Sequence, residues 1–169
     1  GCASKKPSVP DDEPTLAALK GRQPVIAGGA AQAVPPEQAI TQAMASWQAF
    51  LASPALPPRA PERVEAERRL ADLEIERADA VAAQSGQAPD LKLAIRRYTE
   101  FLQKHPDAPG RDGTLYQLSR AHDLAGDPVA ALATLDRLVT DHPKTAVLDE
   151  AQFRRGELLF TAGKHADAE

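Results

Sequence analysis

Between Pro35 and Pro54 the apolar residues recur at the spacing of an α-helix. At intervals of four, three and four residues, one apolar stripe consists of Ile40, Met44, Trp47 and Leu51. These intervals place side chains on one face of a helix, whereas a strand alternates every second residue. Proline suits the first turn of a helix and ends a helix when it falls later. We therefore expect one amphipathic helix between the two prolines.

A second helix is expected from Glu62 to Gln84, after the proline-rich stretch PALPPRAP. Its buried side would be formed by Val64, Leu70, Leu73, Ala78 and Val81. Carboxylates such as Asp72 and Glu74 alternate with arginines along this helix, which is typical of a solvated face with ion pairs four residues apart. The sequence SGQAPD then interrupts the helix.

The remainder of the chain repeats with a period of 37 residues. Positions related by this interval are Ala94, Ala131 and Ala168, then Gly126 and Gly163, and then His105-Pro106 and His142-Pro143. Each unit predicts a helix closed by a glycine, which adopts the left-handed conformation easily, and a second helix ended by proline. The alanine in the second helix allows close helix approach. The predicted fold class is therefore all-α, an array of antiparallel helix pairs.

This pattern resembles the tetratricopeptide repeat, a family that forms a right-handed α-α superhelix. The resemblance rests on four features. Small residues stand late in the first helix, at Ser119 and Gly156, and glycines stand at the turn, at Gly126 and Gly163. In the second helix a small residue is followed by a bulky one, as in Ala131 and Leu135, and a proline closes the unit, at Pro106 and Pro143. The family's period is 34, so we expect about three additional residues near 146–148. The chain departs from the family pattern at Leu115, Gln152, His122 and Leu159.

These patterns divide the chain into three parts. We expect a flexible tether over 1–34, because that segment has prolines, glycines and charges without sustained periodicity. A degenerate repeat helix or cap with a proline-rich loop follows over 35–61. About two and a half repeat units fill 62–169, namely 62–108, 112–145 and a truncated 149–169. The first unit contains an 11-residue insertion. Because the last unit stops early in its second helix, we expect a fragment of a longer array.

Composition narrows the function classes. The chain has 24 acidic and 20 basic residues and a net charge near −4, which argues against nucleic-acid binding. No stretch reaches the ~18 to 20 apolar residues that cross a bilayer. Cys2 is the only cysteine, so an internal disulfide and a cysteine-rich metal site are excluded. We expect no cofactor.

The histidines and one serine are the candidates for reactive groups. His105 and His142 lie one repeat apart, too far to share a metal ion, and we expect them to act as cations at helix C-termini. Ser119, His122 and Asp123 superficially resemble a catalytic triad. However, Ser119 occupies the small, buried repeat position, and neighbouring residues on a helix point about 100° apart. We expect neither a catalytic residue nor a metal site.

A binding groove is the stronger candidate. The resemblance implies that the first helices line the concave side of the superhelix, where the groove positions would be Tyr116, Arg120, Asp123, Phe153, Glu157 and Phe160. Aromatic rings with charges between them suit capture of an extended or helical peptide from a protein partner. The alternative is that Tyr116 and Phe153 belong to the core between helices.

The opening residues GCAS are similar to the end of a bacterial lipoprotein signal, in which a small residue precedes the lipid-bearing cysteine. The resemblance implies lipid attachment at Cys2 and, with Ala3 and Ser4 following, the periplasmic side of the outer membrane. The stretch EAQFRRGELLFTAGKHADA resembles the repeats of the Tol–Pal-associated coordinator of envelope constriction and of the lipoprotein component of β-barrel assembly, and polysaccharide-export lipoproteins are similar in outline. Three hypotheses remain: a lipid-anchored protein-interaction scaffold, a cytosolic adaptor or secretion chaperone, and the targeting module of a longer enzyme.

Overall fold

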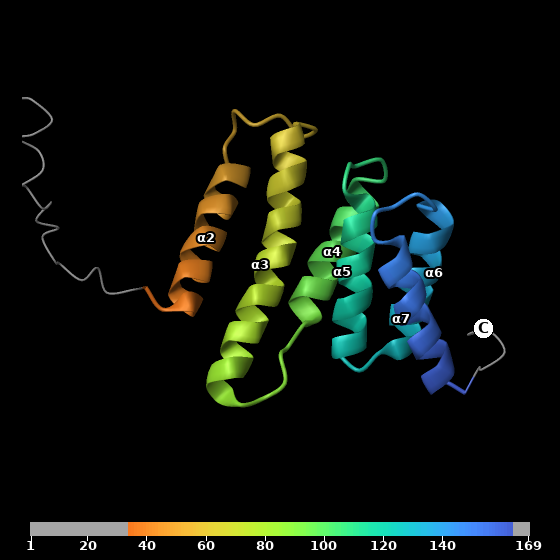
Figure 1. Cartoon of the computed structure of the whole chain (residues 1–169). Helices are drawn as coiled ribbons and strands as arrows, with labels where there is room; N and C mark the ends of the chain where they lie inside the picture. Colours follow the sequence, from red (N-terminus) through yellow and green to blue (C-terminus); the bar gives the residue numbers. More distant parts are fainter. Residues whose placement is uncertain (1–33, 164–169) are drawn as a thin grey trace, which may run out of the picture. The chain divides into compact units, whose positions relative to one another are not determined.

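The computed structural model describes residues 34–163 of the chain (Figure 1). Within this range the elements are α2 Pro36–Leu51, α3 Pro61–Ser85, α4 Lys92–Lys104, α5 Arg111–Leu124, α6 Pro128–Asp141 and α7 Leu148–Thr161. All of them are helices, and no strand occurs among the described residues, so the all-α prediction is confirmed. Cys2, Ala168 and the expected tether up to residue 33 lie outside the described range.

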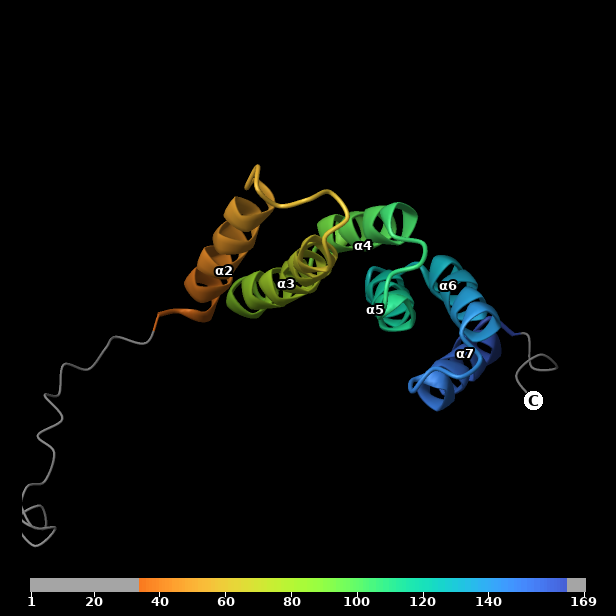
Figure 2. The ribbon, with the colours of Figure 1, turned by 90° about the horizontal axis from the view of Figure 1, so that it is seen from above.

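The helices follow one another in antiparallel pairs. Each helix from α2 to α7 packs against the next one along the chain. Figure 2 shows α3, α5 and α7 on one side of the described unit and α4 and α6 on the other. This alternation is the arrangement of a helical solenoid, in which each pair contacts mainly its neighbours.

The turn between α5 and α6 shows why the repeat needs its glycine. Gly126 has φ of 81°, a left-handed conformation that an L side chain rarely adopts. The N–H of Gly126 donates to the carbonyl of Asp123, and the N–H of Asp127 donates to the carbonyl of His122, both at 2.9 Å. These bonds satisfy the last carbonyls of α5. The Asp127 side chain then accepts from the N–H of Ala130 and starts α6 only three residues after α5 ends.

Three of the small repeat positions are buried, and Gly156 is half-buried. Ala94 is 1% exposed, Ala131 is fully buried and Ser119 is 2% exposed. The main core cluster lies between these helices. Its large side chains are Tyr98, Phe101, Leu102, Leu115, Leu118, Leu135 and Leu138. The closing prolines, Pro106 and Pro143, each follow the C-cap histidine of α4 or α6.

Two expectations for α3 are wrong. Val81 is 43% exposed, because Ala78 is the last buried residue of α3 and the helix continues beyond its packed part. Glu74, expected on a solvated face, is only 2% exposed. Its carboxylate lies 2.9 Å from Arg77 of the same helix and 2.9 Å from Arg97 of α4. The two guanidinium groups compensate the carboxylate for its lost water, so a charged residue occupies a core position.

Candidate partner-binding groove

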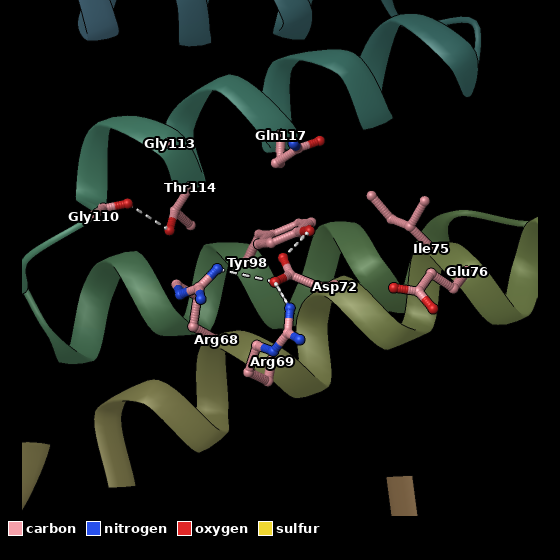
Figure 3. A pocket seen from close by; sticks show the side chains of 10 residues that line it. All are labelled: Arg68, Arg69, Asp72, Ile75, Glu76, Tyr98, Gly110, Gly113, Thr114 and Gln117. Atoms are coloured by element: carbon pink, nitrogen blue, oxygen red, sulfur yellow. Dashed lines mark hydrogen bonds and ion pairs between the residues drawn. The ribbon is translucent and has the colours of Figure 1, made fainter. Parts of the chain in front are cut away.

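Helices α3, α5 and α7 border two crevices on their shared side. The first, of about 440 Å³, lies between α3 and α5 and is drawn in Figure 3. The second, of about 360 Å³, lies between α5 and α7. Its lining residues are Ser119, Arg120, Asp123, Gly126, Pro128, Leu135, Arg154, Glu157, Leu158 and Thr161.

Three of the four charged groups that line the first crevice take part in ion pairs, and Glu76 is the exception within the described residues. Tyr98 of α4 is 1% exposed, and its hydroxyl donates to Asp72 at 2.8 Å. Burial, together with the charge of Asp72, raises the pKa of the Tyr98 phenol, which therefore stays a hydrogen-bond donor. Arg68 donates to Asp72 at 2.9 Å (Figure 3). It also donates to Glu65 at 2.6 Å. Asp72 and Arg68 are therefore occupied by neighbours within the fold.

The second crevice collects three of the predicted groove residues. Arg120 and Asp123 come from α5, and Glu157 comes from α7. Its apolar lining is provided by Leu135 of α6, which is 1% exposed, and Leu158. Helical periodicity explains the arrangement, because residues three or four positions apart on a helix share a face. Tyr116, Phe153 and Phe160 are not part of the lining of this crevice.

Tyr116 connects α5 with α7. Its ring is partly buried against the main core cluster, while its hydroxyl donates to Glu150 at 3.0 Å. Arg154 donates from Nε to the Tyr116 hydroxyl at 3.1 Å, and this hydrogen bond raises the pKa of the guanidinium. Arg154 was not among the predicted groove residues. Its position four residues after Glu150, which favours an ion pair on one helix face, is the pattern that could have indicated it.

Phe153 and Phe160 are both 63% exposed. Phe153 therefore is not a core residue in the described structure, in contrast to its repeat equivalent Tyr116, which packs partly into the core. With Glu157 between them, the two rings follow the spacing of residues on one face of α7. Exposed aromatic rings of this size are frequent in protein-binding surfaces. Their role in binding stays a prediction.

Three charged groups in the second crevice remain without an ion pair within residues 34–163. No salt bridge in this range involves Arg120, Asp123 or Glu157. The side-chain contact of Arg120 is a long one of 3.5 Å to the amide oxygen of Gln117, one turn earlier on α5. This crevice can therefore offer both a cation and carboxylates to a ligand.

The histidines lie at the helix ends where they were expected. His105 caps α4, and its Nε2 is 2.9 Å from the carboxylate of Glu67 on α3. His142 caps α6. In the described part of the chain, no group of three or more histidine, cysteine, aspartate and glutamate side chains is arranged to hold a metal ion. Among the helices of 34–163, none has the length and apolar character to cross a membrane.

Comparison with protein families identifies the repeat itself. Residues 114–145, which span most of α5, all of α6 and the start of the next connection, match the family model described as tetratricopeptide repeat. Searches among curated proteins and among solved structures found no match for this chain. The chain thus contains a tetratricopeptide repeat, a unit whose usual role is to bind other proteins.

Proposed function

We propose that this chain is a non-enzymatic scaffold that captures a segment of a partner protein along α5 and α7. The observation that carries the proposal is the pair of 63% exposed rings, Phe153 and Phe160, beside a crevice with uncommitted charges. Large exposed aromatic side chains next to a preformed crevice are typical binding anchors, and they cost little conformational entropy on association.

The proposed mechanism is reversible binding of the partner to a rigid surface, with no chemical reaction catalysed. The partner segment binds across α5 and α7, the first helices of two units, while the buried alanines and leucines behind them hold the helices in place. Because the surface is formed before binding, the main cost of association falls on the partner. Tyr116 contributes by fixing Glu150 and Arg154 rather than by offering an open ring.

A photo-crosslinking experiment tests this proposal. A benzoyl-phenylalanine placed at Phe153 in cells should give a defined adduct, and the same residue placed at Phe50 of α2, itself 38% exposed, serves as the matched control. The partner identified from the adduct is then purified and titrated against the full chain and a Phe153→Ala variant. Loss of affinity in this variant supports the proposal. Equal adducts from both positions, or unchanged affinity, would contradict it.

We also propose that lipid on Cys2 anchors the scaffold to the periplasmic face of an outer membrane. The support is the sequence GCAS, with a small residue before the cysteine and no aspartate after it. Mass spectrometry of the N-terminal peptide of the native protein tests the idea. A diacylglyceryl mass on Cys2 and release from the membrane by Cys2→Ser support the anchor, whereas an unmodified thiol refutes it.

A further inference from the structure

Among the described residues, most charged groups of the first crevice are paired, whereas in the second only Arg154 has an ion pair, with Glu150. In the first crevice Arg68 bridges Asp72 and Glu65, and Arg69 lies 3.7 Å from Asp72. A ligand that binds Arg68, Arg69 or Asp72 has to compete with ion pairs that already exist, and Glu76 is the one charged group of this crevice without an ion pair among the described residues. In the second crevice the carboxylates of Asp123 and Glu157 have no ion pair within the described residues, so a ligand gains a new interaction without breaking an old one.

The exposed face of α7 is suited to a basic side chain. Phe153, Glu157 and Phe160 occupy positions i, i+4 and i+7 of one helix, so the carboxylate lies between two rings that are each 63% exposed. A lysine or arginine bound there would pair with the carboxylate and contact the negative face of a ring. Asp123, which lines the same crevice from α5, adds a second carboxylate.

Arg120 gives the crevice a second, opposite feature. It is exposed, lines the same crevice and has no carboxylate within ion-pair distance in the described range. It is also repeat-equivalent to Glu157, so cation and anion sit at matching positions on α5 and α7. Side chains of α5 and α7 meet at Tyr116 and Arg154, so groups of a ligand that bind Arg120 and Glu157 lie close together on one segment.

We propose that the partner segment carries a basic and an acidic side chain close together in its sequence. The basic group binds between Asp123 and Glu157, beside Phe153 and Phe160, and the acidic group binds Arg120. This inference rests on the proposed function, since it names the chemistry of the partner that binds the same surface. Complementary charges of this kind set the register of the segment and the choice of partner more than they set total affinity.

Selection from a random peptide library tests the proposal. A library of 12-residue peptides displayed on phage is selected against the immobilised full chain, and the most enriched peptide is labelled and titrated. We expect a recurring basic residue near an acidic one. The double variant Asp123→Asn with Glu157→Gln should bind this peptide roughly tenfold more weakly, the effect of two exposed ion pairs near the upper end of their range. Glu100→Gln on α4, a carboxylate 54% exposed, is the matched control and should leave binding unchanged.

Exchanging the charges of the two groove positions tests which of them binds the basic group and which binds the acidic group of the peptide. The variant that combines Arg120→Glu with Glu157→Arg should lose the selected peptide and prefer one in which the two charges are exchanged. Helicity measured by circular dichroism verifies that each variant folds. Binding to the wild-type chain should also weaken as salt is raised, since the pairs are exposed.

The outcomes separate this inference from the proposed function. Peptides that lack the charge pair but depend on Phe153 would refute the inference and leave the scaffold in place. If no selected peptide depends on Phe153, both are wrong. A dimer of the full chain that dissociates on Phe153→Ser would assign this face to a second copy and refute the inference as well.

Discussion

Replacing Glu74 by leucine should leave the fold as stable as before or make it more stable. Glu74 is 2% exposed. Its carboxylate is shielded from solvent and forms ion pairs with Arg77 and Arg97. Once the 11-residue insertion of the first unit is allowed for, the repeat equivalent of Glu74 in α7 is Leu159. Leu159 is 4% exposed, so this position accepts leucine elsewhere in the same chain. Leucine and glutamate have similar volumes, and the exchange therefore leaves no large cavity.

The magnitude follows from the exposure of the partners. A buried ion pair replaced by a well-packed apolar residue is typically neutral or stabilising by about 1–4 kcal/mol. The side chains of Arg77 and Arg97 are 41% and 29% exposed, so both guanidinium groups return to water when the carboxylate is removed. We therefore expect a gain at the low end, about 1 kcal/mol. Arg97→Ala should have the opposite sign and cost about 2 kcal/mol, less than the usual 3–5 because Arg77 remains beside Glu74.

Urea unfolding followed by circular dichroism at the helical band measures both changes. The midpoint should stay or rise for Glu74→Leu and fall for Arg97→Ala, with unchanged slopes. In thermal unfolding 1 kcal/mol corresponds to about 3–5 °C for a domain of this size. A loss of stability of about 2 kcal/mol or more in Glu74→Leu would show that the pairs outweigh the desolvation cost, and our reasoning would be wrong.

Further predictions address the groove, the packing and the pH dependence. Phe153→Ala should change the free energy of unfolding by less than about 1 kcal/mol, because the ring is mostly exposed. Tyr116→Ala should lower the free energy of unfolding by about 2 kcal/mol, because packing and hydrogen bonds are lost. Equal losses of the two variants in urea unfolding would contradict this. Ala131→Leu, at a fully buried position, should cost about 1–3 kcal/mol by overpacking, and an unchanged midpoint would refute it. The hydrogen bond from Thr145 lowers the pKa of Asp112, so the bond stabilises the fold above the unfolded-state pKa of about 4 and loses this effect as pH falls. Thr145→Val should therefore reduce stability at pH 7 by about 1 kcal/mol and much less at pH 3; a difference that does not depend on pH would exclude this cause.

The repeat positions could be predicted because their requirements are local. A glycine that closes a helix and an alanine where helices meet are needed whatever the rest of the chain does, and Gly126 and Ala131 behave as expected. Glu74 could not be predicted in this way. Among alternating arginines it looks like a solvated residue, and its burial depends on Arg97, which lies on another helix.

The groove residues show the same limit. Tyr116 and Phe153 occupy equivalent positions, and the sequence alone left open whether both were core or surface. The structure separates them, since α7 brings Glu150 and Arg154 onto Tyr116, whereas Phe153 stays exposed within the described residues. The environment of a repeat position thus depends on the neighbouring unit, which a period along one sequence does not describe.

Met44 is the only buried side chain of α2, and this has a kinetic consequence. In a linear array each helix is stabilised mainly by its neighbours, so unfolding proceeds from the section with the least burial. α2 packs against α3 and holds no side-chain cap at its first residue, whereas α5 and α6 share the main core. Amide hydrogens in α2 should therefore exchange with solvent through frequent local openings, while those of α5 and α6 exchange only when the array as a whole comes apart.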